Sequence, residues 1–174
     1  MKKMTIDNAH SEVGFKVKHL MISTVKGKFA TFNGEVQEDG RVSVSMNVNS
    51  INTGNMDRDN HLTGEDFFDT IKFPTINFSG NMSEDMNTIT GEITIKGITK
   101  EVTLNTEYNG MSVDPWGNTK HGWEITGTIN RNDFGLVWNA PLETGGVLVS
   151  EEVKLSMDIQ MMEVQEEAVT ESSN

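Results

Sequence analysis

The sequence predicts an all-β domain built from about eight strands. Apolar and polar residues alternate with a period of two along most of the chain, turn-forming residues separate the alternating runs, and only one long segment departs from this period. The run 42–49 is the clearest case, because it places four apolar side chains on one face and four polar ones on the other. Such a run is typical of a strand with one buried face.

Alternation recurs from the beginning of the chain to its end. The predicted strands are 13–17, 29–36, 42–49, 76–78, 89–95, 102–104, 123–129 and 153–161. Asp39-Gly40, Lys96-Gly97 and Asn109-Gly110 separate successive runs closely enough for antiparallel hairpins. We therefore expect a mostly antiparallel sheet in which strands adjacent in sequence pair with one another.

The segment 56–68 has helical spacing and lacks a run of β-branched residues. It predicts a short helix that covers one end of the sheet. A second candidate, 132–134, has room for one helical turn at most. The predicted fold class is therefore all-β with one or two short helices.

About eight alternating strands favour either a closed barrel or a sandwich of two sheets, and periodicity alone does not separate the two. A barrel of this size either fills with its own side chains or keeps room for one small ligand. Gly80, Gly91 and Gly127 lie in register with the apolar face, where small residues leave space, although glycine also marks bulges and bends. The eleven methionines either line a ligand site or fill gaps in the core.

Composition excludes several classes of function. The chain has 174 residues and no cysteine, so we expect a single domain with no disulfide, no thiolate nucleophile and no zinc-thiolate site. The net charge of −12 disfavours nucleic acids and anionic lipid surfaces as partners. With neither an apolar signal segment nor a long apolar run, we expect a soluble, cytoplasmic protein without stable membrane insertion.

The end of the chain differs from the rest in composition. Residues 163–174 contain four acids and no base, so the remainder carries about −8, since −12 minus −4 leaves −8. The predicted organisation is one β-barrel domain over 1–164 followed by an acidic, disordered tail over 165–174.

Several motifs occur in order along the chain. They are Asp7-Asn8-Ala9-His10-Ser11, Ser50-Ile51-Asn52-Thr53-Gly54, Arg58-Asp59-Asn60-His61-Leu62, Asp66-Phe67-Phe68-Asp69, Phe73-Pro74-Thr75-Ile76-Asn77-Phe78, 91–100 and Arg131-Asn132-Asp133-Phe134-Gly135-Leu136. This series resembles the motifs of the YceI-like, polyisoprenoid-binding proteins. The similarity extends over roughly residues 4–162. It implies an extended, lipocalin-like barrel of eight antiparallel strands with a lengthwise apolar channel, and pairing into homodimers.

The implied function is non-catalytic binding of a long-chain amphiphile such as a polyisoprenoid, an isoprenoid quinone or a fatty acid derivative, without a cofactor. Many relatives carry a secretory signal, whereas this chain begins almost directly with its first strand, so we do not expect a role linked to export. The residues expected to contact the ligand are Phe15, Val17, His19, Arg58, Asp59, His61, Phe67, Phe78, Ile93, Trp123 and Phe134.

The polar candidates each have a structural alternative. Arg58, Asp59 and His61 either hydrogen-bond a polar ligand head or form a network at the start of the helix. His19 continues the inward register of its strand, where its imidazole needs a protein partner or a ligand group.

Two other functions compete with the carrier. One is an enzyme in which His61 acts as a general base oriented by Asp59, although the sequence has none of the familiar enzyme motifs. The other is a fully packed barrel that acts in a stress response or binds partners through its acidic surface. The four histidines lack the paired spacing of a metal site on one element, so no metal is predicted.

Overall fold

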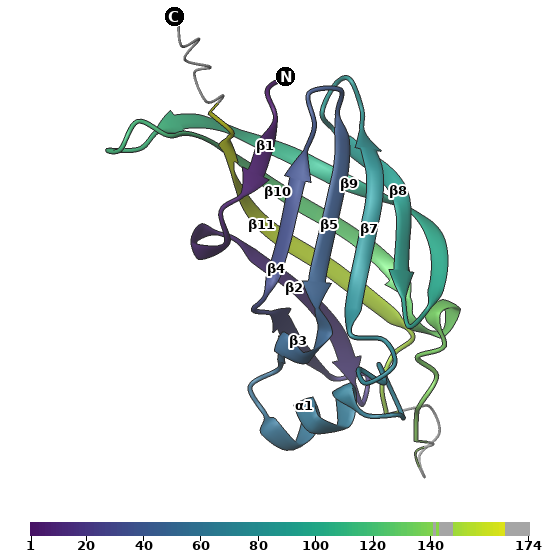
Figure 1. Ribbon diagram of the computed structural model, residues 1–174. Coiled ribbons are helices and arrows are strands. Elements are labelled where there is room, and N and C mark those ends of the chain that lie inside the picture. The colour runs from purple at the N-terminus through teal and green to yellow at the C-terminus, as the bar shows by residue number, and fades with distance from the viewer. Residues whose placement is uncertain (141, 143–147, 166–174) are drawn as a thin grey trace, which may run out of the picture.

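A computed structural model of the chain describes residues 1–140, 142 and 148–165. These residues form an antiparallel sheet that closes on itself, with one α-helix across one end (Figure 1). The strands are β1 (Met4–Ile6), β2 (Glu12–His19), β3 (Ser23–Phe29), β4 (Phe32–Val36), β5 (Arg41–Asn47), β6 (Ile51–Asn52), β7 (Thr75–Met82), β8 (Thr88–Ile95), β9 (Ile98–Val113), β10 (Thr119–Asn130) and β11 (Glu152–Glu163). The helices are α1 (Met56–Thr63) and the 3-10 turns η1 (Asn8–His10), η2 (Val48–Ser50) and η3 (Arg131–Phe134).

The strand order decides between the two predicted architectures. β1, β4, β5, β7, β8, β9, β10 and β11 pair in that order, and β11 then pairs with β1 to close a ring of eight. The protein is thus an eight-stranded barrel and not a sandwich. Closure leaves these strands without a free edge. The sheet therefore presents no row of unpaired backbone N–H and C=O groups to which another chain could pair.

Bends in the first three barrel strands account for the three remaining strands, β2, β3 and β6. β1 and β2 both pair with β11 on either side of η1, so they are two halves of one bent strand. β3 with β4, and β5 with β6, are related in the same way. The predicted strand 29–36 is therefore wrong in its boundaries, because it spans the bend between β3 and β4.

Two of the three predicted hairpin turns are present. Lys96 and Gly97 have φ of 51° and 74° and join β8 to β9, and Gly40 has φ of 88° between β4 and β5. The turn predicted at Asn109-Gly110 is wrong, because both residues lie inside β9. There Gly110, with φ of 106°, occupies a bulge opposite the Gly122/Trp123 step of β10, and the chain turns instead at residues 114–118.

The predicted helix 56–68 is present but shorter, because α1 ends at Thr63. Gly64 follows it in an extended conformation, and residues 64–73 form successive turns joined by backbone hydrogen bonds. The helical turn predicted at 132–134 is confirmed as η3. No helix in the described ranges is long and apolar enough to cross a membrane.

The barrel has two different ends. Because successive strands run antiparallel, the connections 20–22, 53–74 and 96–97, with the described residues 131–140 and 148–151 between β10 and β11, lie together at one end, which we call the helix end. The N-terminus and the connections 37–40, 83–87 and 114–118 lie at the other, the termini end (Figure 1). The predicted acidic tail, 165–174, lies outside the described residues apart from Gln165.

Glycines in the barrel wall admit large neighbours and do not leave the space predicted for them. A Cβ atom on Gly80 or Gly91 would lie 2.9 Å from Cζ of Phe78, and one on Gly127 would lie 2.5 Å from Cδ2 of Leu104. These distances are too short for a side chain at the glycine positions. Gly80 and Gly91 therefore make room for the ring of Phe78, and Gly127 makes room for Leu104. Space for a ligand comes from elsewhere in the barrel.

Candidate functional site

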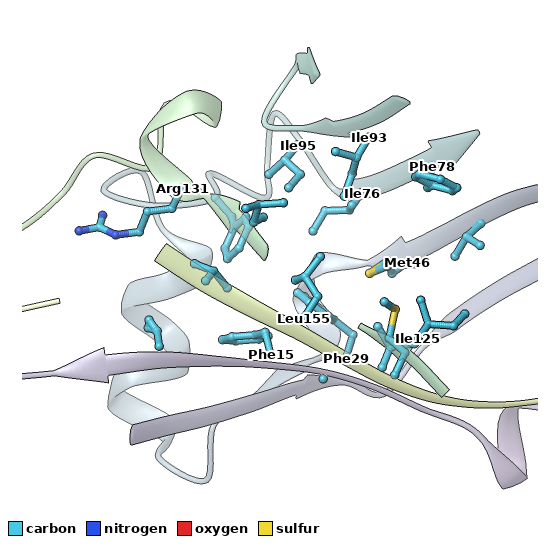
Figure 2. Close-up of a pocket in the computed structure, with 18 of the residues that line it drawn as sticks. Phe15, Phe29, Met46, Ile76, Phe78, Ile93, Ile95, Ile125, Arg131 and Leu155 are labelled. Atoms are coloured by element: carbon cyan, nitrogen blue, oxygen red, sulfur yellow. The ribbon is translucent and has the colours of Figure 1, made fainter. Parts of the chain in front are cut away.

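The barrel contains a cavity of about 530 Å³. Side chains from the bent first strands and from β7, β8, β10 and β11 converge on it, as Figure 2 shows for Phe15, Phe78, Ile93, Ile125 and Leu155. The walls are almost entirely apolar. Four methionines contribute to them, namely Met46, Met82, Met157 and Met161.

The structure brings together most of the residues predicted to contact a ligand. The cavity is lined by Phe15, Val17, His19, Arg58, His61, Phe67, Phe78, Ile93 and Trp123. Asp59 and Phe134 are not part of the lining. Phe134 lies in η3 and is buried in the hydrophobic core.

Arg58 and Asp59 form a network at the start of α1. The Asp59 carboxylate accepts hydrogen bonds from the backbone N–H of Thr53, at 3.0 Å, and from its Oγ1, at 2.6 Å. Nε of Arg58 donates to Oγ1 of Thr53 at 2.8 Å, and Nη2 donates to the Thr53 carbonyl at 2.7 Å. These contacts fit the structural alternative for this pair, because both side chains pin the segment before the helix.

His61 is held by a different acid from the one predicted. Its Nε2 lies 2.8 Å from Oδ2 of Asp66, and its ring meets Phe67 and Trp138 edge to face, with centroids 5.1 and 4.8 Å away. The predicted orientation of His61 by Asp59 is therefore wrong, since the Asp59 carboxylate faces Thr53. This removes the geometric basis of the general-base hypothesis as it was framed.

His19 lines the cavity near the helix end and is half-buried. Within the described part of the chain its ring makes no hydrogen bond, while its carbonyl accepts one from Oγ of Ser23 at 3.2 Å. An imidazole with free nitrogens in an apolar wall is available to a polar group of a ligand.

Trp123 lines the cavity toward the termini end and belongs to a cluster of aromatic rings. Trp123 is 3% exposed and packs on Tyr108 and His121, with ring centroids 5.0 and 5.8 Å away. Nδ1 of His121 lies 2.7 Å from the Tyr108 hydroxyl, and its Nε2 lies 2.9 Å from Oε1 of Glu163. The hydrogen bond with His121 holds the pKa of the Glu163 carboxyl below its ordinary value.

Among the described residues, the indole N–H of Trp123 is buried and has no hydrogen-bond partner. Leaving a buried donor unpaired costs about 1–3 kcal/mol, so such groups are rare in folded proteins. Because Trp123 belongs to the cavity wall, an acceptor oxygen on a bound molecule could satisfy this donor.

No three metal-ligating side chains converge anywhere in residues 1–140, 142 and 148–165. The chemistry offered by the cavity is burial of apolar surface, with a few polar groups near each end.

Comparison with known sequences identifies the fold family. The sequence model of the YceI-like domain matches residues 4–161. The chain belongs to the YceI-like family. A UPF0312 protein of Staphylococcus aureus is 43% identical to it over 161 residues, which cover 88% of this chain and 94% of that protein.

Solved structures of YceI-like proteins share the barrel. The YceI protein of Campylobacter jejuni superimposes with a TM-score of 0.71 at 31% identity, covering 92% of this chain and 97% of that one. A polyisoprenoid-binding domain from Saccharophagus degradans gives a TM-score of 0.69 at 12% identity and covers 94% of this chain and 100% of that one, which shows a common fold.

The buried arginine of this YceI-like protein, Arg131, was not among the predicted site residues. Arg131 is 4% exposed and lies in the cavity wall, with its guanidinium directed away from the apolar interior (Figure 2). It donates to the carbonyls of Leu136, Trp138, Val149 and Ser150 at 2.6–3.2 Å, and so fastens the segment after η3 to the barrel.

Burial lowers the pKa of Arg131, and the charge of Glu151 opposes that shift. The position of Arg131 in the sequence could have identified it as a buried arginine. Arg131 continues the inward register of Trp123, Ile125 and Ile129, and an arginine in such a register needs buried acceptors.

Proposed function

We propose that this protein binds and carries a long-chain amphiphile in the barrel cavity without transforming it. The ligand class is a polyisoprenoid, an isoprenoid quinone or a fatty acid derivative. The observation that carries the proposal is the barrel cavity of about 530 Å³ with apolar walls. Its volume lies within the range of about 300–1,000 Å³ that is usual for small-molecule sites.

The shape and chemistry of the cavity suit an elongated molecule. Its lining extends from His19 and His61 at the helix end to Trp123 near the termini end. Each methylene withdrawn from water contributes about 0.8 kcal/mol, so a chain of about twelve carbons would bind tightly even after the cost of ordering it. The Saccharophagus degradans neighbour, which is named for polyisoprenoid binding, supports the same ligand class.

The cavity also weighs against a fully packed barrel. A barrel whose interior is filled by its own side chains leaves the surface as the only place for function. Here the interior retains space, and the four lining methionines are side chains that adapt to irregular apolar ligands.

The first test is native mass spectrometry of the protein purified from its own cells, followed by organic extraction. We expect a co-purifying isoprenoid or fatty amphiphile whose mass is unchanged after incubation with the protein. A protein that arrives bare and also ignores added prenyl and fatty-acyl probes would overturn the proposal. Conversion of the released molecule into a product would show an enzyme instead.

Neighbouring residues of β11 provide a matched pair of variants. Leu155 lines the cavity, whereas Ser156 is exposed on the outer face. Leu155→Trp should weaken binding of a fluorescent fatty-acid probe by about tenfold or more, because two displaced methylenes already forfeit about 1.6 kcal/mol. Ser156→Trp adds the same side chain outside the barrel and should leave the affinity unchanged. Equal affinities in both folded variants would contradict a site inside the barrel.

Residence in the cytoplasm and pairing into homodimers stay predictions. Sedimentation of the purified protein measures the second, and fractionation of the source cells measures the first.

A further inference from the structure

Lysines gather on the outer face of β11, β2 and β3. We call Lys16, Lys18, Lys26, Lys28 and Lys154 the lysine face; all five are exposed. In the sheet register Lys154 lies opposite Lys16, and Lys16 lies opposite Lys26. Like charges directly opposite one another destabilise a sheet. These lysines repel one another and so destabilise the sheet locally, and they form a positive region on a protein whose net charge is −12.

No ion pair joins these five lysines to a carboxylate in the described part of the chain. Within the described part of the chain, the lysines that form ion pairs are Lys2, Lys3, Lys72 and Lys120, and none belongs to the lysine face. Lys18 donates instead to Oγ1 of Thr24 at 3.0 Å. The lysine face is thus free to meet an external anion.

The turn between β2 and β3 exposes apolar side chains beside these lysines. Leu20, Met21 and Ile22 are 37%, 62% and 84% exposed. Leu20 and Met21 have φ of 55° and 59°, in a turn closed by a hydrogen bond from the Ile22 N–H to the His19 carbonyl. Such a turn favours Asn-Gly, and large apolar residues adopt it at a cost. Strained, exposed side chains of this kind are characteristic of functional surfaces.

The turn lies at the helix end, where the cavity also reaches. The backbone N–H of Leu20 donates to the carbonyl of Leu148, and Leu148 lines the cavity together with His19 and Arg58. Three further exposed apolar side chains stand on connections at this end, namely Met56, Ile71 and Val137.

We propose that the β2–β3 hairpin docks the protein on an anionic phospholipid surface, with residues 20–22 entering the acyl boundary and the lysine face against the headgroups. This inference deepens the proposed function, because a carrier must meet the membrane that holds its ligand. Apolar insertion together with lysine–headgroup attraction is the usual basis of peripheral membrane binding.

The overall negative charge does not oppose this contact at short range. In physiological salt, charges further away than about 8–10 Å are largely screened, so the surface next to the lipid decides the interaction. The acids of the α1 region, Asp57, Glu65, Asp66 and Asp69, lie at the same end. They favour an orientation in which the hairpin, and not α1, faces the lipid.

The docking test measures co-sedimentation of the whole protein with vesicles in the absence of a carried ligand. We expect binding to vesicles of equal parts phosphatidylglycerol and phosphatidylcholine, little binding to pure phosphatidylcholine, and loss of binding in high salt. Equal binding to both vesicle types, or to neither, would overturn the proposal. Tighter binding to a double-stranded DNA oligonucleotide than to the anionic vesicles would assign the lysine face to a different polyanion and overturn it as well.

Variants separate docking from folding and from ligand binding. The triple variant Lys16→Gln, Lys26→Gln, Lys154→Gln should weaken vesicle binding by about a hundredfold, because each lysine near an anionic surface contributes about fivefold. Its resistance to urea should stay equal or rise, since repulsion within the sheet is removed. The control Lys2→Gln, Lys3→Gln, Arg41→Gln makes the same change in charge at the termini end and should bind as the parent protein does.

The hairpin itself is tested by Leu20→Asn with Met21→Gly, residues that suit the turn geometry. This double variant should keep or gain stability and should lose at least about tenfold in vesicle binding. Uptake of a fatty-acid probe from solution should remain unchanged in it, so a failure of docking is distinguishable from a failure of the cavity. Vesicle binding that survives both the lysine and the hairpin variants would overturn the proposal.

Discussion

Arg131 shows how one side chain can organise the helix end. Its guanidinium is buried and donates to four carbonyls of the segment that follows η3. The charge has no carboxylate in direct contact among the described residues, so backbone dipoles hold it. The residue acts on the shape of the cavity wall through the loop that it fixes.

Arg131→Met should lower the free energy of unfolding by about 2–4 kcal/mol, because it leaves several buried carbonyls without donors. Urea denaturation measures the change. Arg41→Met is the control, since Arg41 pairs with Asp39 on the exposed surface and such pairs contribute about 0–1 kcal/mol. Equal losses in the two variants would contradict the anchoring role.

A single glycine, Gly27, determines how a neighbouring aromatic ring packs. Gly27 lies under the ring of Phe15, where an added Cβ atom would come within 2.6 Å of Cε1. The missing side chain makes room for the ring of Phe15, which lines the cavity.

At the scale of elements, α1 and the segment before it determine how the helix end is covered. The helix has eight residues, too few to be stable alone, and contacts with its flanks must hold it. Asn55 caps it by accepting a hydrogen bond from the N–H of Arg58 at 3.0 Å, while Arg58 and Asp59 bind Thr53.

Asn55→Ala should lower the free energy of unfolding by about 1 kcal/mol, because an orphan donor of the first turn loses its acceptor. Amide hydrogen exchange should accelerate in residues 56–63 more than in the barrel strands. Asn60→Ala is the control: Asn60 is exposed within α1, and alanine there should be neutral or slightly stabilising. Uniform acceleration across the barrel would argue against a local role for the cap.

At the scale of the whole molecule, contacts distant in sequence close the barrel at the termini end. Nζ of Lys120 on β10 contacts Asp7, which precedes η1, and lies 3.8 Å from Oδ2 of Asp114. Glu163 on β11 contacts His121 on β10. The hydrogen bond from Lys120 holds the pKa of the Asp7 carboxyl below its ordinary value, with a smaller contribution from His10.

The lowered pKa of Asp7 determines how the free energy of unfolding depends on pH. The folded state binds the proton of Asp7 less tightly than the unfolded state does. The contact between Asp7 and Lys120 therefore stabilises the fold at pH values above the pKa of Asp7 in the unfolded chain, which is about 4. This contribution is lost as the pH falls through the folded pKa. Asp7→Asn should therefore lower the free energy of unfolding by about 1 kcal/mol at pH 7, and the difference from the parent should shrink in acid.

Urea unfolding at several pH values measures this difference. Lys120→Met removes the same contact from the other side and should show the same dependence on pH. A difference between Asp7→Asn and the parent that stays constant from neutral to strongly acidic pH would contradict the assigned contact.

The sequence determined the local structure of this protein. Strict alternation in runs such as 42–49 fixed which side chains face inward, because a strand presents alternate residues to opposite faces. The glycine of Lys96-Gly97 indicated a hairpin because its left-handed turn favours glycine. Most of the apolar residues predicted to contact a ligand line the cavity because they share the inward register. The ordered motifs also indicated the YceI-like family.

The tertiary structure decided what depends on contacts between distant residues. The bends in the first strands, the bulge at Gly110, the partner of His61 and the carbonyls around Arg131 all involve groups that local patterns do not relate. The same holds for charge: the sequence gives a net charge of −12, but only the sheet register brings Lys154, Lys16 and Lys26 side by side. Periodicity specifies the face on which a residue lies, whereas its neighbours there are set by how the strands pair.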